Sequence, residues 1–455
     1  MKNCVLVGIG MENPSALSPQ AVAAIQNAPI VAGAERMVQA VAHLVHGKTL
    51  ASWETQAISD AFSEYADSDR APCAVFSGDT GFYSGATKLR SLLEANGWHV
   101  ATLPGPSTAQ YLSAQIGKPW QDWHLVSAHG TDTNLGIALS YAPKTFFLTG
   151  GSVTVRSIAK FLLDHDCDAV LTVGSHLGAP AASGGRAIRG SASAPFCTDF
   201  ACAQPVQNGK AAPPIPSPES QSENPSAFTE TIFSGSPSEV LARTDYDEAL
   251  SCVLVERAIP DLPRAALPDT FFVRNVDSAQ PTVPMTKRFV RAAILSLMAV
   301  RDGETVWDIG CGTGAVSVDL ARSAHCAVHA VEYKEEACNL IRQNCAKAGL
   351  LNLEVVCGRA PECLSDLPAP DAVFVGGSEG ELRPILRAAK EKNPACRIVV
   401  SCVTLETLSE LQSVSAALGY ECEAVQLSVS ESKKAGDYHL MAAQNPVWLV
   451  SLEAK

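Results

Sequence analysis

The sequence Asp308-Ile309-Gly310-Cys311-Gly312-Thr313-Gly314 joins an apolar run to a segment of helical periodicity at 315–321. Its glycines allow the backbone to approach a ligand where a side chain would clash. A dinucleotide-binding turn has the pattern G-x-G-x-x-G, with the third glycine one position later. Glu332 follows Gly310 by 332 − 310 = 22 residues, at the distance expected of a partner for ribose hydroxyls. This spacing predicts a site for a nucleoside-bearing ligand and favours S-adenosylmethionine. The alternatives are that the loop binds a nicotinamide dinucleotide, or that it is a plain turn without a ligand.

Short apolar runs alternate with helical patterns on both sides of this loop. Such alternation predicts a doubly wound, Rossmann-like sheet of seven strands, with its ligand at the carboxyl ends of the strands. We expect one domain over residues 265–455. The expected strands are 305–309, 327–331, 353–356, 372–375, 397–402, 423–429 and 447–452, and the expected helices are 315–321, 335–348, 382–392 and 405–418.

The first 260 residues show a second α/β pattern, for which we expect a largely parallel sheet. Ser18-Pro19 has the form of a helix start, an N-cap followed by proline at the first helical position. Residues 195–243 are rich in Pro, Ser, Asn and Gln, so we expect a disordered insertion there. The expected strands are 4–7, 74–76, 100–103, 124–126, 145–148, 169–173 and 251–256.

Composition narrows the class of protein. The net charge of −13 argues against a nucleic-acid binder, which normally carries a basic surface. No apolar run reaches the roughly 18 residues of a membrane span. The 15 cysteines include no C-x-x-C pair and no cluster with zinc-site spacing, so we expect no metal site. Scattered thiols fit a reducing compartment, and we expect a cytoplasmic protein.

A second glycine-rich segment, Gly376-Gly377-Ser378-Glu379-Gly380, follows the strand expected at 372–375. The pattern G-x-S-x-G also occurs at the nucleophilic serine of hydrolases. A hydrolase would need an acid and a histidine downstream, and His439 is the one histidine that follows. We therefore favour a loop over the ligand cleft, with Ser378 near the methyl acceptor.

Seven further segments of the C-terminal half match the sequence motifs of a known protein family. They are Leu267–Phe272, Pro284–Lys287, Val306–Gly310, Gly358–Glu362, Val375–Ser378, Val403–Glu406 and Gln444–Val447. Together they resemble the C15-methylating, decarboxylating methyltransferase family of cobalamin biosynthesis. Arg359 is a departure, because the family usually has an aspartate there. The resemblance implies donor contacts at Thr286, Asp308, Gly310, Cys311, Gly312, Thr313, Gly314, Glu332 and Ala360.

The N-terminal half resembles the tetrapyrrole methylase family, in its C5-methylating branch. The matching segments are Val7–Gly10, Ser77–Tyr83, Leu103–Thr108, Pro119-Trp120 and Ser127–Gly130. Departures are Met11-Glu12, where Pro-Gly is usual, and Thr80, where Pro is usual. The resemblance implies a class III methyltransferase fold of two α/β subdomains, which encloses the insertion. It also implies a second donor site at Gly8, Gly10, Asp79, Gly81, Ser107 and Thr108, with substrate contacts at Tyr83 and His129. Asp79 could equally shape a turn, and His129 could be structural.

The two resemblances together imply an enzyme that methylates a precorrin at C5 and C15 with S-adenosylmethionine and removes the C12 acetate carboxyl. They leave open whether the tetrapyrrole carries cobalt, and they imply self-association. The alternatives are a methyltransferase of another small molecule and a protein that binds the donor or a corrinoid without catalysis. Neither a metal nor a catalytic triad is required, and no catalytic residue is assigned.

A basic cluster precedes the glycine loop in the sequence. A precorrin carries many carboxylates, which Arg and Lys bind well. Lys287, Arg288 and Arg291 are therefore candidates for substrate binding. The alternative is that they form a solvated face of a helix.

Overall fold

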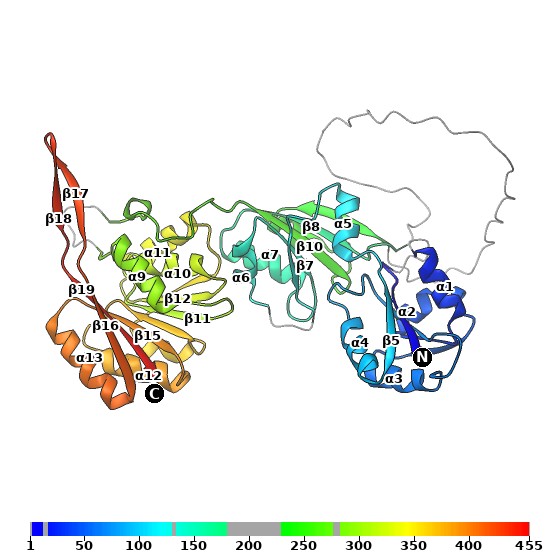
Figure 1. Cartoon of the computed structure of the whole chain (residues 1–455). Coiled ribbons are helices and arrows are strands. Elements are labelled where there is room, and N and C mark those ends of the chain that lie inside the picture. The colour runs from blue at the N-terminus through cyan, green and yellow to red at the C-terminus, as the bar shows by residue number, and fades with distance from the viewer. Residues whose placement is uncertain (1, 12–16, 130–132, 180–228, 276–282, 455) are drawn as a thin grey trace.

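The computed structural model describes residues 2–11, 17–129, 133–179, 229–275 and 283–454. Figure 1 shows three α/β units that follow one another along the chain, with the N-terminal unit at one end and the C-terminal unit at the other. The first two units each contain a five-stranded sheet, and the third contains a seven-stranded sheet. The expected division into an N-terminal region of two subdomains and a C-terminal Rossmann-like domain is confirmed.

The first unit is a parallel sheet with the strand order β3-β2-β4-β1-β5. Every residue of β2 is buried, as expected for a parallel strand covered on both faces. Ser18 caps the first helix as predicted, and Pro19 is the first helical residue. The elements are β1 (Lys2–Gly8), α1 (Pro19–Asn27), β2 (Ile30–Gly33), α2 (Glu35–Ala40), the 3-10 turn η2 (Ala42–Leu44), β3 (Lys48–Ala51), α3 (Thr55–Ser63), β4 (Cys73–Phe76), α4 (Ala86–Ala95) and β5 (Trp98–Leu103).

The second unit has a mixed sheet, in the order β6-β7-β10-β8-β9. Strand β10 lies between β7 and β8 and is antiparallel to both, so this sheet is not largely parallel. The chain thus returns to this sheet after the insertion, as the resemblance implied. The elements are α5 (Thr108–Ile116), β6 (His124–Ser127), α6 (Leu135–Tyr141), β7 (Lys144–Leu148), α7 (Val155–Asp164), β8 (Ala169–Ser175), β9 (Thr231–Gly235), α8 (Pro237–Ala242) and β10 (Ser251–Arg257).

The prediction of disorder over residues 195–243 is wrong at its C-terminal end. Strand β9 pairs with β8, and Phe233 is buried in the core of the unit. Ser236 then caps α8 through a capping box with Glu239, and Pro237 is the first helical residue. The prolines and serines that suggested disorder here are a helix start. The rest of the expected insertion, up to residue 228, lies outside the described residues.

The third unit has the strand order β13-β12-β11-β14-β15-β19-β16. Its first five strands are parallel, and β19 runs antiparallel between β15 and β16. The elements are η3 (Asp269–Phe271), α9 (Arg288–Met298), β11 (Thr305–Ile309), α10 (Ala315–Ser323), β12 (Ala327–Glu332), α11 (Glu335–Lys347), β13 (Leu353–Cys357), η4 (Glu362–Asp366), β14 (Ala372–Val375), α12 (Leu382–Lys392), β15 (Arg397–Cys402), α13 (Leu405–Leu418), β16 (Tyr420–Leu427) and β19 (Val447–Ala454).

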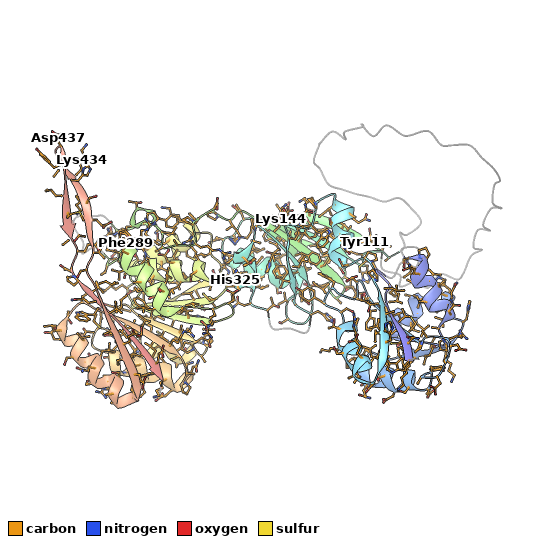
Figure 2. All side chains as sticks on the ribbon, viewed as in Figure 1. Tyr111, Lys144, Phe289, His325, Lys434 and Asp437 are labelled. Carbon is orange, nitrogen blue, oxygen red and sulfur yellow. The ribbon has the colours of Figure 1, made fainter. Side chains whose placement is uncertain are left out.

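A two-stranded hairpin between β16 and β19 was not predicted. It consists of β17 (Ser430–Ala435) and β18 (Tyr438–Ala443). Figure 2 shows its tip, with Lys434 and Asp437, far from the body of the unit. Apolar side chains on β18 are exposed, among them Leu440 and Met441.

The second and third units meet at the turn between α11 and β13. Leu351, in this turn, packs into the core of the second unit and is 8% exposed. Its amide donates to the hydroxyl of Ser140 at 2.8 Å, and its carbonyl lies against Gly136, where a Cβ would overlap it. Beside this contact, the ring of Tyr141 meets His325 with centroids 3.8 Å apart. The two units therefore share a small, closely packed junction.

Candidate active sites

The glycine loop of the third unit lies at the carboxyl end of β11, in the middle of the sheet. Gly310 has φ +70°, and a Cβ there would overlap the Gly377 carbonyl and lie 2.8 Å from the Gly377 nitrogen. Gly312 has φ +56°, and its Cβ would lie 2.6 Å from the Pro284 carbonyl. Each glycine is thus required both by its backbone conformation and by a neighbouring backbone. Gly314, at φ +72°, is the N-cap of α10.

A cavity of about 460 Å³ opens above this loop. That volume lies in the range of small-ligand sites, roughly 300–1,000 Å³. The predicted residues that line it are Thr286, Asp308, Gly310, Cys311, Gly312, Glu332, Ala360 and Ser378. Thr313 and Gly314 do not line it: both are buried behind the loop. The structure therefore brings together, around one cavity, predicted residues that are up to 92 positions apart in the chain, from Thr286 to Ser378.

Glu332 is held by the backbone at the end of β12. Its Oε2 accepts the amide of Gly312 at 3.0 Å. Its Oε1 accepts the amides of Tyr333 and Lys334 at 3.0 and 3.1 Å. The carboxylate lines the cavity with its orientation already fixed, as a group that receives ribose hydroxyls should be.

Asp308 is fully buried at the floor of the cavity. Its Oδ2 accepts the hydroxyl of Ser317, whereas its Oδ1 has no hydrogen-bond partner among the described residues. Burial raises the pKa of this carboxyl to about 7, and the charge of Glu332 acts in the same direction. A buried oxygen without a partner is costly, so Asp308 is suited to receive a cationic or hydrogen-bonding part of a ligand.

Three loops are tied together at one rim of the cavity by residues that sequence analysis did not assign. The hydroxyl of Tyr333, after β12, donates to Glu379, after β14, at 2.6 Å. Glu379 also meets Arg359, after β13, at 3.5 Å. Arg359, the departure from the family pattern, thus forms a rim contact with an acidic partner. Their positions directly after consecutive strands were the available signal.

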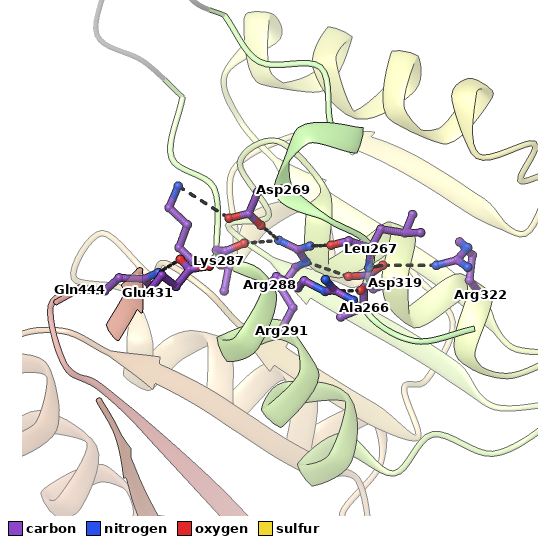
Figure 3. Close-up of polar contacts among 11 residues, drawn as sticks. Ala266, Leu267, Asp269, Lys287, Arg288, Arg291, Asp319, Arg322, Glu431 and Gln444 are labelled. Atoms are coloured by element: carbon purple, nitrogen blue, oxygen red, sulfur yellow. Dashed lines mark hydrogen bonds and ion pairs between the residues drawn. The ribbon is translucent and has the colours of Figure 1, made fainter. Parts of the chain in front are cut away.

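The structure corrects the prediction for Arg291, which lies in a buried polar network (Figure 3). Its guanidinium donates to Asp319 at 2.7 Å and to Asp269 at 2.8 Å. Two further donor contacts go to backbone carbonyls, and the group stacks over the ring of Phe272. Arg291 is 0% exposed, so it holds the segment before α9 in place and does not reach a substrate.

Removal of Arg291 should strongly destabilise the third unit. Burial already raises the pKa of Asp319, and Arg291→Met would remove the closer of its two ion pairs, leaving the one with Arg322 at 3.4 Å. We expect a loss of about 3–5 kcal/mol in the free energy of unfolding, measured by urea titration. Adding Asp319→Leu should restore most of it, and Arg288→Gln, on the exposed surface, should change stability by less than about 0.5 kcal/mol. Equal small effects of Arg291→Met and Arg288→Gln would contradict this role.

The other two members of the basic cluster remain accessible. Lys287, the residue before α9, has 44% of its side chain exposed and lies 3.9 Å from Asp269. Arg288 is exposed and donates to the carbonyl of Ala266 at 3.0 Å. Neither lines the cavity, but they directly follow in sequence Thr286, which does. Their role in binding substrate carboxylates stays a prediction.

In the N-terminal region, three glycine loops pack backbone to backbone at the carboxyl ends of β1, β4 and β5. A Cβ on Gly8 would lie 2.6 Å from the Gly78 carbonyl and 2.8 Å from the Gly105 nitrogen. Gly10 and Gly78 exchange two backbone hydrogen bonds, at 2.9 and 3.1 Å. Gly8 and Gly10 thus shape the edge of the sheet and do not line the neighbouring cavity themselves.

That neighbouring cavity has a volume of about 850 Å³ and lies between the first and second units. Three predicted residues line it: Thr108, Tyr83 and His129. The hydroxyl of Tyr83 donates to the carbonyl of Leu125 at 3.0 Å, which links the two units. Residues that sequence analysis did not assign to this cavity include Arg36, Trp53, Lys88 and His176.

The remaining predicted residues shape the turns next to this cavity and do not line it. Asp79 accepts the amide of Gly81 at 2.7 Å, which is the turn-forming role held open from the sequence. Ser107 is buried, and its hydroxyl accepts the amide of Gln110 in the capping box of α5. Asp79, Gly81 and Ser107 do not line the cavity.

The hydrolase alternative finds no geometric support. His439 lies on β18 in the projecting hairpin and does not share the cavity with Ser378. Within the described ranges no group of three or more His, Cys, Asp or Glu side chains could hold a metal ion. Likewise, none of the helices seen in those ranges has the length and apolar character needed to cross a membrane.

The sheet order, the glycine loop and the acidic residue after the second strand define a Rossmann-like fold with a cavity suited to a nucleoside-bearing ligand, the architecture of many methyltransferases. Comparisons with known proteins agree. Residues 280–453 match the family described as a precorrin methyltransferase domain, and residues 3–183 match the tetrapyrrole (corrin/porphyrin) methylases. The chain belongs to the precorrin methyltransferase family, with a tetrapyrrole methylase module fused ahead of the C-terminal module. It is an S-adenosylmethionine-dependent methyltransferase of cobalamin biosynthesis.

The similar proteins cover the C-terminal module almost completely. The probable cobalt-precorrin-6B C(15)-methyltransferase (decarboxylating) of Pyrobaculum calidifontis is 40% identical over 191 residues, which are 41% of this chain and 95% of the relative. The relative of the same name from Methanothermobacter thermautotrophicus is 34% identical over 40% of this chain and 94% of its own length. A solved precorrin-6Y C5,15-methyltransferase structure from Geobacter metallireducens is 31% identical, with 43% of this chain and 100% of that chain covered and a TM-score of 0.39.

Proposed function

We propose that this chain methylates a precorrin at C5 and C15 and removes the carboxyl of its C12 acetate side chain, as a precorrin-6Y C5,15-methyltransferase (decarboxylating). The observation that carries the proposal is the presence of two cavities of ligand size at glycine-loop strand ends, one in each methylase module of a single chain. If each module methylates one of the two carbons, the presence of two cavities is explained. The proposal includes a cytoplasmic location and self-association, which we infer from the class of enzyme.

The residues of the third unit fit S-adenosylmethionine. Glu332 offers a fixed carboxylate for the ribose hydroxyls, and Asp308 offers an oxygen without a partner to the amino-acid end of the donor. The glycines at 310 and 312 let the loop pack closely against the backbones of Gly377 and Pro284, which line the same cavity. When bound, S-adenosylmethionine supplies a methyl group activated by the positive charge on its sulfur.

The protein's contribution to methyl transfer is then mainly geometric. The loops after β11, β12 and β14 hold the donor in the cavity and limit its exposure to water. An electron-rich carbon of the reduced tetrapyrrole needs no strong base to attack, and the conjugated ring can accept the electrons that decarboxylation releases. We therefore assign binding and orientation to the named residues and no acid–base role.

The cobalt-containing form of the substrate is a second candidate. The curated relatives are named for cobalt-precorrin-6B, whereas the solved Geobacter structure is named for precorrin-6Y. Both forms present the same reacting carbons, so the proposal covers both and the assay should offer both.

Mass spectrometry of the product tests the proposal. We expect the full-length chain to add two methyl groups to precorrin-6Y, or to its cobalt form, and to release one carbon dioxide. A product with no added methyl from either form, under conditions in which S-adenosylmethionine binds, would refute it.

A variant of the N-terminal module tests the two-site assignment. In Gly105→Ala a Cβ would overlap the Gly8 carbonyl and lie 2.6 Å from the Gly78 carbonyl, so the three packed loops would separate. We expect loss of the C5 methyl, with C15 methylation and decarboxylation retained. Equal loss of both methyl groups in a variant that still folds would contradict one site per module.

A further inference from the structure

The third unit exposes large apolar side chains at the edge of the sheet where the donor cavity opens. Val403 is 71% exposed and Leu405 is 77% exposed. Outside the hairpin, they are the two most exposed large apolar side chains among the described residues of this unit. Two exposed large apolar side chains on one short segment are typical of a surface that binds a ligand or a partner.

These residues lie beside the loop that lines the donor cavity. Strands β14 and β15 are parallel neighbours, with Val375 opposite Val400. The segment 376–378 therefore leaves β14 next to the point where 403–405 leaves β15. The hydroxyl of Ser401 donates to the carbonyl of Gly376 at 3.4 Å and ties the two exits together. Gly376 and Ser378 line the cavity, so the segment 403–405 leaves the sheet next to a loop that lines it.

Phe289 adds an apolar side chain to the same edge. Helix α9 packs on β15, and Arg397, at the start of β15, donates to the carbonyl of Met298, at the end of α9. The helix thus runs antiparallel to the strand. Its 11 residues span about 16 Å, close to the length of the strand, so its first turn lies at the carboxyl edge. Phe289, in that turn, is 50% exposed and is labelled in Figure 2.

Positive charge accompanies these apolar groups. Lys287 and Arg288 directly precede Phe289, and both side chains are accessible. The edge therefore combines three apolar side chains with two cations, next to the cavity that would hold the donor. This combination suits a ligand with a broad apolar face and anionic groups at its periphery.

We propose that Val403, Leu405 and Phe289 form a platform on which the macrocycle of the precorrin acceptor rests, while Lys287 and Arg288 receive its peripheral carboxylates. The proposal rests on the proposed function and specifies how the acceptor binds. The acceptor carbon must come within bonding distance of the donor's methyl group, and a tetrapyrrole ring is too broad to enter a cavity of about 460 Å³ beside the donor. The ring must therefore lie across the loops that border the opening.

The test uses the full-length chain with the double substitution Val403→Ser and Leu405→Ser. Because both side chains are exposed, the variant should fold normally. We expect the KM for the precorrin in C15 methylation to rise about tenfold or more, and the Kd for S-adenosylhomocysteine to stay within about twofold. The conservative pair Val403→Ile and Leu405→Met should keep a KM close to that of the native chain.

A matched control is the pair Leu440→Ser and Met441→Ser on β18, which are 60% and 67% exposed. This pair should leave the KM unchanged. An unchanged KM in the Val403 and Leu405 variant, or an equal rise in the control, would overturn the platform. So would a change in molar mass by light scattering, because it would assign the surface to contact with a second copy. Failure of the native chain to methylate any precorrin would instead remove the proposed function, so the two failures are distinguishable.

Discussion

Gly310→Ala should abolish C15 methylation and decarboxylation while C5 methylation continues. The new Cβ would overlap the Gly377 carbonyl and lie 2.8 Å from the Gly377 nitrogen, so the loops after β11 and β14 would have to separate. Both loops line the donor cavity, and their separation should remove the donor site. We expect C15 turnover to fall at least about 100-fold, since a displacement of about 1 Å in a positioned site can have that effect. Product mass spectrometry and calorimetry with S-adenosylhomocysteine measure both consequences.

Gly303→Ala is the matched control. Gly303 has φ +84°, so alanine meets a similar backbone penalty there, but its Cβ would find no atom within 4 Å. That variant should lose roughly 1–2 kcal/mol of stability and keep both methylations. If Gly303→Ala lost C15 methylation as fully as Gly310→Ala, backbone strain and not overlap with Gly377 would be responsible.

Asp308→Asn should weaken donor binding and remove its pH dependence. In the native chain the pKa of Asp308 is about 7, so the carboxyl is protonated below that pH and must lose its proton to pair with the donor's ammonium group. Affinity for S-adenosylmethionine should therefore fall by up to tenfold per pH unit as the pH drops below 7. Asparagine has no charge to offer, so the variant should bind roughly 10–100-fold more weakly at pH 7.5, with a flat profile between pH 5.5 and 7.5. Calorimetric titration across that range measures both effects.

Asp308→Asn should weaken donor binding but increase the stability of the ligand-free chain. A carboxyl whose pKa is raised on folding destabilises the folded state once the pH exceeds the unfolded value near 3.8, and the full penalty is present above about 7. Asp308→Asn should therefore raise the melting temperature of the ligand-free chain at pH 8 and have little effect near pH 4. A pH profile of binding identical to that of the native chain would show that another group governs donor affinity.

Sequence patterns predicted the central architecture well because the strands of the third unit are apolar and regularly spaced. The strands missed in the first unit, β2 and β3, have four residues each, and β3 is mostly exposed, so neither gives a periodic signal. Strand β9 was missed because proline-rich sequence surrounds it, and only its pairing with β8 reveals it. The hairpin β17–β18 lacks a buried face, which is the feature that sequence analysis detects.

The donor site was predicted more completely than the acceptor site, for a physical reason. Glycine spacing and an acidic residue at a strand end are local in sequence, so Gly310 and Glu332 could be identified directly. Arg291 could not be told apart from Lys287 by sequence, because its burial depends on Asp269 and on Asp319, 28 residues away. The place of Val403 near the donor cavity follows only from the pairing of β14 with β15, where Ser401 contacts Gly376.

The junction at Leu351 couples the stability of the two modules. Leu351 belongs to the third unit but fills part of the core of the second, so the folded state of one module stabilises the folded state of its neighbour. By thermodynamic linkage, a donor molecule bound at the glycine loop of the third unit also contributes to the stability of the tetrapyrrole methylase module, which it never touches.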